Sequence, residues 1–305
     1  MLVRGVDFGL SFLFSYSTPL YDFEEIPRGF SFTKALGACA GLICRYDRNS
    51  LEAICDVPRG CTDPQKILGL DRSPAFRDLC AALGADKCPS QHITIIGHEG
   101  DRLPIFVAAF LSRSTDYFTN VVRWAREFIR GGRPEKYGSF QVRQLIDAFP
   151  AIYGILSSRR HDALEEAGEL LALRNVGHKV VAAYLLHAYG MTEYAPLDRH
   201  YLEFLPELRG KLRPPEKAQC RLSGLRCSSC PRRRSCLHGV LVERLGRFNG
   251  VLQSLAYVAG RLSRSSRGLA ALLTADREWL ADRLEALIER SISIFFSGTQ
   301  PDQLA

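Results

Sequence analysis

The stretch LLALRNVGHKVVAAYLLHAYG, residues 170–190, predicts the end of one helix, a tight turn over 174–177 and then a second helix. Apolar residues recur at helical spacing on both sides of the turn. Such a turn presents backbone N–H groups and the positive end of a helix dipole, which suits a phosphate oxygen. Helical hairpins with a glycine are also common packing units, so the turn alone leaves both explanations open.

A single aspartate follows this hairpin in a distinctive context. Asp198 stands 19 residues after Lys179, within APLDRHYLEFL. Pro196 interrupts the preceding segment, and an aspartate in this position is well suited to cap the next helix. Capping would be a sufficient role if the residue stood alone. The hairpin before it and the cysteine-rich loop after it place Asp198 in a context that capping alone does not explain.

The 10 cysteines fall into two groups that differ in their spacing. One group has no metal-ligand pattern and is expected to consist of core thiols or disulfides: Cys39, Cys44, Cys55, Cys61, Cys80 and Cys88. The other group has the spacing C-x6-C-x2-C-x5-C and consists of Cys220, Cys227, Cys230 and Cys236. Four thiols this close together in sequence predict a bound metal or cluster.

Positive charge is concentrated around the second cysteine group. The whole chain has a net charge of +7, and the segment from Arg209 to Cys236 contains one acid, Glu216. Its nine basic residues are Arg209, Lys211, Arg213, Lys217, Arg221, Arg226, Arg232, Arg233 and Arg234. A local excess of this size, in a segment that also holds four cysteines, favours nucleic acid as the partner.

These features together resemble the helix-hairpin-helix DNA glycosylase superfamily, which includes endonuclease III and the adenine, alkyladenine and 8-oxoguanine glycosylases. The family hairpin L-P-G-V-G-x-K is similar to Leu173, Val176, Gly177 and Lys179 here, with Arg174 and Asn175 at the two remaining positions. Asparagine tolerates a left-handed backbone, so the turn is expected to survive. The cysteine spacing resembles the [4Fe-4S] loop of endonuclease III. The separation of lysine and aspartate resembles the 8-oxoguanine glycosylase branch.

The resemblance implies a bifunctional DNA glycosylase and AP lyase acting on duplex DNA that contains a damaged base. Lys179 would be the nucleophile, Asp198 the electrostatic and acid–base residue, and the four cysteines the ligands of a [4Fe-4S] cluster. The DNA-contacting residues implied are Arg113, Arg174, Asn175, Val176, Gly177, His178, Arg232, Arg233 and Arg234. Two alternatives stay open, namely a monofunctional glycosylase and a non-catalytic DNA-binding module whose four cysteines hold zinc.

The expected fold class is α+β and mainly α. Strands predicted at 10–16, 38–46, 51–57 and 92–98 form a small antiparallel sheet, with a helix near 73–84. Further helices are predicted at 139–148, 162–172, 177–189, 198–205, 238–262 and 275–295, after a helical region that begins at Leu103. The expected domains are a β-rich domain at 1–100, a helical subdomain with the hairpin at 101–197, and a second helical subdomain at 198–305. The resemblance implies an iron–sulfur loop at 220–236. This loop would be inserted before the helix at 248–262, which resembles a core helix of the family.

Composition limits the class of protein. Hydrophobic residues make up 46% and charged residues 24% of the chain, close to the average for soluble globular domains. The longest apolar runs are about half the length of a membrane span of roughly 18 residues. No secretory signal is visible near the first residues. The expectation is a monomeric, cytoplasmic and nucleoid-associated protein with no membrane partner.

Overall fold

A computed structural model describes residues 1–84, 88, 92–158, 162–263, 268–274, 277 and 279–297. Helices dominate these ranges, and one antiparallel sheet lies near the N-terminus, so the predicted α+β, mainly α fold class is confirmed. No helix in the described ranges has the length and apolar content that a bilayer crossing requires.

The sheet has five strands in the order β1-β5-β4-β3-β2, all antiparallel to their neighbours. They are β1 (Leu2–Arg4), β2 (Tyr21–Ile26), β3 (Gly29–Lys34), β4 (Ile43–Asp47) and β5 (Glu52–Asp56). The strand predicted at 51–57 is confirmed as β5. Of the strand predicted at 38–46, only the part from residue 43 onward is a strand, as β4. Strands β1, β2 and β3 were not predicted.

The helices of the first half are α1 (Phe8–Phe14), α2 (Pro64–Ile67), α3 (Ser73–Leu83), α4 (Arg102–Leu111), α5 (Val122–Ile129), α6 (Phe140–Ser157), α7 (Ala163–Ala172) and α8 (His178–Tyr189). The second half contains α9 (Arg199–Glu203), α10 (Pro206–Lys211), α11 (Lys217–Leu222), α12 (Leu237–Leu245), α13 (Asn249–Leu262), α14 (Leu269–Thr274) and α15 (Leu280–Phe296). The predicted helices near 73–84, 162–172 and 177–189 are confirmed as α3, α7 and α8.

The strand predicted at 10–16 is wrong, because this segment belongs to helix α1. All seven residues of α1 are buried, so its apolar run lacks the polar face that separates a helix from a buried strand in sequence. The Asp7 side chain begins the helix by accepting a hydrogen bond from the Leu10 N–H at 3.0 Å.

The strand predicted at 92–98 is also wrong. Within the described residues this segment makes one isolated bridge, between His92 and Val6, and otherwise has no regular structure. Its isoleucines, Ile93, Ile95 and Ile96, are nevertheless fully packed in the core. Their apolar character therefore indicated burial and did not indicate a strand.

The helix predicted at 238–262 is two helices. Gly246, with a φ of 51°, separates α12 from α13, a backbone conformation that glycine adopts without steric cost. The helix predicted at 139–148 is longer than expected, because α6 continues through Pro150 to Ser157. Helices α10 and α11 were not predicted, and the helix predicted at 275–295 is α15, with 275, 276 and 278 outside the described residues.

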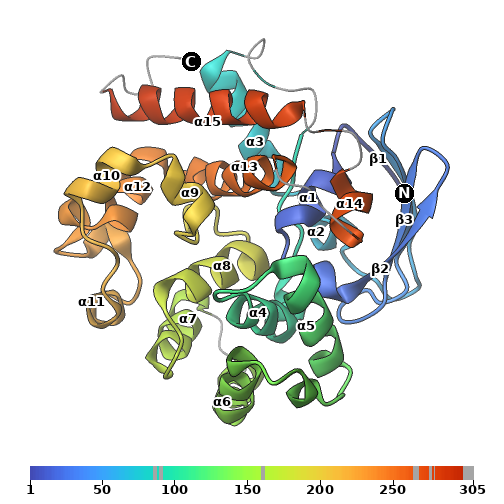
Figure 1. The fold of residues 1–305 in the computed structure, drawn as a ribbon, viewed down its shortest axis with the longest axis horizontal. Coiled ribbons are helices and arrows are strands. Elements are labelled where there is room, and N and C mark those ends of the chain that lie inside the picture. Colours follow the sequence, from blue (N-terminus) through green and yellow to red (C-terminus); the bar gives the residue numbers. More distant parts are fainter. Residues whose placement is uncertain are drawn as a thin grey trace.

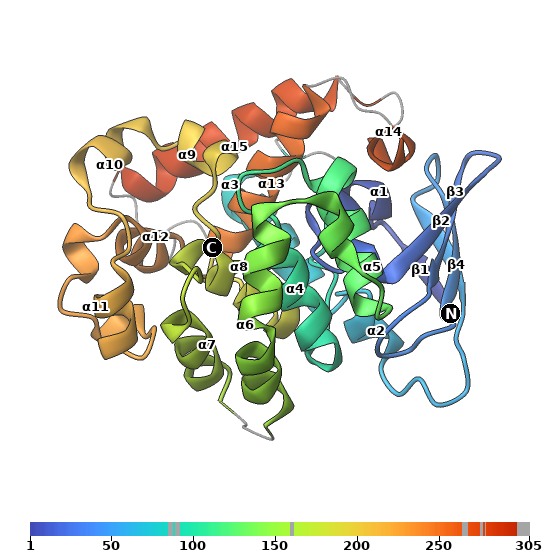
Figure 2. The same ribbon diagram turned by 60° about the horizontal axis from the view of Figure 1, so that its bottom comes forward.

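Two hydrophobic clusters form the core. One cluster combines the N-terminal sheet, α1 and α3 with α12, α13 and α15 from the C-terminal part of the chain. The other cluster is built mainly from α4 to α8. In both ribbon views the sheet lies at one end of the molecule and α10, α11 and α12 lie at the other (Figures 1 and 2). The space between the two clusters contains the candidate active site.

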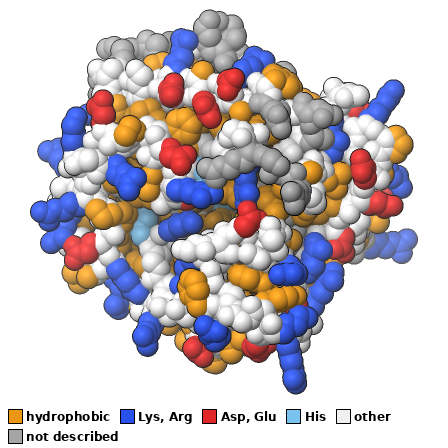
Figure 3. Space-filling view, in the orientation of Figure 1, with side chains coloured by type: hydrophobic (Ala, Val, Ile, Leu, Met, Phe, Trp, Pro, Cys, Tyr) orange, Lys and Arg blue, Asp and Glu red, His pale blue; other side chains and the backbone are white. Residues whose placement is uncertain are grey.

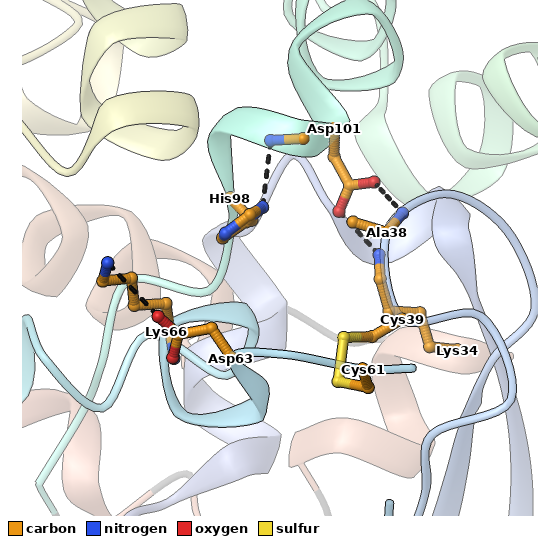
Figure 4. The surroundings of a disulfide bond; sticks show 9 residues. Lys34, Ala38, Cys39, Cys61, Asp63, Lys66, His98 and Asp101 are labelled. Atoms are coloured by element: carbon orange, nitrogen blue, oxygen red, sulfur yellow. Dashed lines mark hydrogen bonds and ion pairs between the residues drawn. A yellow bond between two sulfur atoms is a disulfide. The ribbon is translucent and has the colours of Figure 1, made fainter. Parts of the chain in front are cut away.

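Six cysteines form disulfides, pairing Cys39 with Cys61, Cys44 with Cys55 and Cys80 with Cys88. The sequence left open whether these six cysteines are core thiols or disulfides, and the structure shows disulfides. Figure 4 shows the Cys39–Cys61 bond beside a fully buried ion pair, in which Lys34 Nζ lies 2.7 Å from Asp101 Oδ2. This pair joins β3 to the turn before α4, and so fixes the sheet to the helical part.

Candidate active site

A cavity of about 530 Å³ opens between the two core clusters. Its wall combines residues from the end of α1, the segment after α4, the hairpin helix α8, the start of α9, and α13. Figure 3 shows the molecule in the orientation of Figure 1, and Lys and Arg side chains border a hollow near the middle of the face drawn there. Lys179 and Asp198, predicted from sequence as the catalytic pair, both line this cavity.

Lys179 lies in the first turn of α8, directly after the hairpin turn. Burial lowers the pKa of this amine below its ordinary value, because a low-dielectric surrounding disfavours the charged form. The negative charge of Asp198 opposes this shift, and the nearby positive charge of Arg199 adds to it. The amine is therefore more easily deprotonated than an exposed lysine, as a nucleophile requires.

Asp198 both caps α9 and faces the cavity. Its Oδ1 accepts a hydrogen bond from the Tyr201 N–H at 3.0 Å, and its Oδ2 accepts one from Gln253 Nε2 at 2.9 Å. Burial raises the pKa of the carboxyl, while these two hydrogen bonds and the neighbouring Lys179 oppose that rise. The capping role and the active-site role considered from sequence are thus compatible in one residue.

The rest of the cavity wall was not predicted. Aromatic and imidazole side chains make up much of it, namely Phe14, Tyr16, Tyr117, His187, His200 and Tyr257. They come from five separate parts of the chain, so no local spacing in the sequence could have grouped them. Arg261 and Asp116 form an ion pair of 2.9 Å at the same cavity. Flat aromatic rings interspersed with many polar and charged groups suit a planar, heteroatom-rich ligand.

The hairpin turn has the geometry that the sequence suggested. Asn175 adopts the left-handed conformation, with a φ of 65°, in the position where the family pattern has glycine. Arg174, Asn175 and Gly177 are exposed, whereas Val176 is buried. Within the described part of the chain, no protein atom accepts a hydrogen bond from the N–H groups of Gly177 and His178. These donors are available to an anion at the N-terminus of α8.

Two cationic side chains donate hydrogen bonds to the carbonyl groups of the turn. Lys217 Nζ donates to Leu173 O at 2.7 Å and to Val176 O at 3.1 Å. Arg113 donates to Asn175 O at 2.8 Å, and its guanidinium stacks 3.8 Å from the Phe110 ring centroid. Arg113, predicted to face DNA, therefore also supports the hairpin. Lys217 was counted in the basic segment but was not predicted to touch the hairpin.

The four remaining cysteines are free and line one small enclosed cavity. Burial and the neighbouring thiols raise the pKa of Cys220 to about 11 and that of Cys227 to about 12. His178 and His238 line the same cavity. Within the described residues, no three His, Cys, Asp or Glu side chains converge closely enough to hold a single metal ion.

The three consecutive arginines predicted to contact DNA have different surroundings. Arg232 forms an ion pair with Glu216. Arg233 donates to the Ser228 carbonyl and lines the cysteine cavity. Arg234 is exposed.

Comparison with known proteins places the fold. No protein-family model matches the sequence, and no curated protein does so. A structure of MBOgg1 in complex with a low-affinity DNA ligand is similar with a TM-score of 0.53 and 16% identity, over 85% of this chain and 94% of that one. An 8-oxoguanine glycosylase/lyase of Clostridium acetobutylicum, in complex with duplex DNA, gives 0.52 and 11%, over 85% and 93%. This chain therefore has the helix-hairpin-helix fold of the 8-oxoguanine glycosylases.

Proposed function

We propose that this protein is a DNA glycosylase with AP lyase activity, which removes a damaged base from duplex DNA and then nicks the strand. One observation carries the proposal: Lys179 and Asp198 line the same aromatic-walled cavity, next to a hairpin turn whose Gly177 and His178 N–H groups have no acceptor among the described residues. The two similar solved structures, both complexes with DNA, support it. The fold alone would not, because one fold hosts many activities.

The hairpin supplies the binding step. Free N–H groups at the start of α8 and the exposed Arg174 suit a phosphate of the DNA backbone. Enzymes that act on a base in duplex DNA flip the nucleotide out of the stack and into a pocket. A cavity with aromatic walls next to the phosphate-binding turn fits that requirement.

Lys179 supplies the nucleophile. Its neutral Nζ attacks C1′ of the flipped nucleotide, the bond from C1′ to the base nitrogen breaks, and the base leaves with a proton. Loss of the amine protons and opening of the sugar give an imine between Nζ and C1′. Removal of a proton from C2′ then expels the 3′ phosphate by β-elimination, which nicks the strand. Hydrolysis of the imine releases the lysine unchanged.

Asp198 supplies charge and proton transfer. Its carboxylate stabilises the positive charge that develops at C1′ as the base departs. It can also take a proton from the attacking amine. The hydrogen bonds from the Tyr201 N–H and Gln253 hold the carboxylate in a fixed orientation, so little reorganisation is needed during the reaction.

The four free cysteines fit an iron–sulfur cluster. A [4Fe-4S] cluster is bound by four thiolates, and here the four thiols line one cavity. Their C-x6-C-x2-C-x5-C spacing, which resembles that of the endonuclease III loop, favours the cluster over zinc. Cys220, Cys227, Cys230 and Cys236 would hold the cluster, which would supply a fixed structural centre for the basic segment from Arg209 to Cys236.

The proposal is tested by a screen of duplexes that each carry one damaged base. Base release and strand nicking are measured separately, by alkali treatment of one half of each reaction. We expect one class of lesion to give release, with nicking that does not require alkali. If nicking appears only after alkali, the protein is a monofunctional glycosylase. The absence of base release from every lesion would contradict the proposal.

A further inference from the structure

The segment from Arg213 to His238, which ends in the first turn of α12, contains the four cysteines and also contacts the hairpin. We call residues 213–238 the cysteine loop. Lys217 is three residues before Cys220, and its ammonium donates to two carbonyls of the hairpin turn, Leu173 O and Val176 O. Lys217 is thus a side chain of the loop that satisfies backbone groups of the turn.

A second contact joins the loop to the start of α8. The His238 side chain is 1% exposed, and its Nδ1 lies 3.3 Å from Cys227 Sγ. The ring of His238 packs against that of His178, with centroids 4.2 Å apart. Within the described residues, His238 Nε2 and His178 Nδ1 are buried and have no hydrogen-bond partner. Both rings line the cysteine cavity.

These contacts determine which way the peptide groups of the turn face. In a trans peptide the C=O and the following N–H point in opposite directions. When Lys217 fixes Leu173 O and Val176 O toward the loop, the N–H groups of Arg174 and Gly177 are turned outward. The same bonds that satisfy the carbonyls therefore orient the donors toward an anion.

We propose that the cysteine loop holds the hairpin turn in its anion-binding conformation, with Lys217 and His238 as positioning residues. When Cys227 is a thiolate, as cluster ligation would make it, the Nδ1–H of His238 donates to its sulfur, and the His238 ring fixes His178 and so the first turn of α8. Loss of order in the loop then loosens the turn and displaces the neighbouring Lys179. The consequences for DNA binding and for the cluster rest on the proposed function. The contacts between the cysteine loop and the hairpin do not.

Amide hydrogen exchange of the turn tests the positioning role independently of activity. Peptides that cover 170–182 are compared between the wild type and Lys217→Met, which keeps the length of the stem and removes the donor. We expect the hydrogen-bonded amides of these peptides, Val176, Val180 and Val181, to exchange roughly tenfold faster, since hydrogen bonds from a charged group to two carbonyls of the turn are lost. Lys217→Arg should restore part of the protection.

Lys211→Met is the matched control. Lys211 belongs to the same basic segment, but its side chain is 73% exposed and pairs with Glu207 on its own helix. This variant loses the same charge and should leave exchange at the turn unchanged. Affinity for an undamaged duplex should fall further in Lys217→Met than in Lys211→Met, because only the first change also disorders the turn.

His238→Phe tests the second contact, because it keeps a flat ring beside His178 and removes the N–H donor. We expect a shifted visible absorption of the purified protein, faster loss of iron in the presence of a chelator, and faster exchange at the start of α8. Exchange at the turn that is unchanged in both Lys217→Met and His238→Phe would overturn the proposal. Faster exchange in a protein that releases no base would keep it and reject the glycosylase function.

Discussion

Lys179 and Asp198 are two ionisable groups in one cavity, and burial shifts both toward their neutral forms. Burial lowers the pKa of Lys179 and raises that of Asp198, while each charge partly offsets the shift of the other. Opposite shifts of this kind allow a proton to pass between an amine and a carboxylate at modest cost. The proposed lyase step needs a neutral amine, and the lowered pKa of Lys179 favours that form relative to an exposed lysine.

Asp198→Asn tests the charge of the carboxylate while it keeps the helix cap. Asparagine can still accept the hydrogen bond from the Tyr201 N–H, so α9 should remain intact. We expect single-turnover base release to fall by about 10² or more, with lesion binding retained. Asp147→Asn, an exposed carboxylate on α6, is the control. Excision near the wild-type rate would leave Asp198 as a cap alone.

Lys179→Met tests the lowered pKa through its effect on stability. The unfolded chain has the ordinary lysine pKa of 10.5, so between the lowered folded value and 10.5 the unfolded state binds more protons. The free energy of unfolding of the wild type should therefore rise, relative to Lys179→Met, as pH increases through that window. Denaturant unfolding at several pH values measures the difference. A constant difference from neutral to alkaline pH would contradict the shift.

At the scale of elements, the hairpin and the cysteine loop act on each other. Helices α7 and α8 form the hairpin, and Lys217 at the start of α11 fixes its turn from behind. Asp162, the cap of α7, pairs with Arg226 of the loop at 3.0 Å. The cysteine loop therefore contacts both ends of α7, the helix that leads into the hairpin turn.

Cys227→Ser tests the ligand assignment. Three thiolates hold a cluster poorly, so we expect this variant to lose its iron and its broad visible absorption when purified without oxygen. Ser229→Ala, an exposed change in the same loop, should keep both. Iron content equal to that of the wild type in Cys227→Ser would remove this cysteine from the ligand set.

The sequence predicted the elements that have clear local signals and missed those that depend on distant contacts. The hairpin helices were predicted because Asn175 and Gly177 interrupt two apolar periodic segments. Helix α1 was taken for a strand, because every one of its residues is buried in the final fold. The division of α12 from α13 depends on Gly246, which is tolerated inside many helices and gave no clear stop signal.

The same distinction applies to the candidate site. Lys179 and Asp198 could be predicted because they stand in recognisable local contexts. Gln253, which holds the Asp198 carboxylate, lies on α13 and is brought there by tertiary packing. Lys217 was one of nine basic residues and nothing in its spacing marked it as a hairpin contact. Such partners become visible only when the chain is folded.

At the scale of the whole molecule, the N-terminal sheet and the C-terminal helices share one core cluster. The first 14 residues reach the active-site cavity through Phe14 at the end of α1, and α13 and α15 pack in the same cluster. The site thus depends on segments from both halves of the chain. Disulfides in the N-terminal part should stabilise this assembly.

The Cys39–Cys61 bond allows that stabilisation to be measured. It closes a loop with a sequence separation of 22 residues. The double variant Cys39→Ser, Cys61→Ser should lose about 3 kcal/mol of unfolding free energy in oxidising buffer, through the added freedom of the unfolded chain. In reducing buffer the two proteins should be equally stable. Equal stability in oxidising buffer would mean that the bond does not form.

Borohydride trapping is the sharpest test of Lys179 as the nucleophile, because only an amine nucleophile gives an imine that borohydride can reduce. The wild type is mixed with the duplex whose base it releases, and borohydride is added during the reaction. We predict a covalent protein–DNA adduct at Lys179, and neither adduct nor nicking with Lys179→Gln, which still binds the duplex. An adduct that persists in Lys179→Gln, or base release by the wild type without any adduct, would contradict the account.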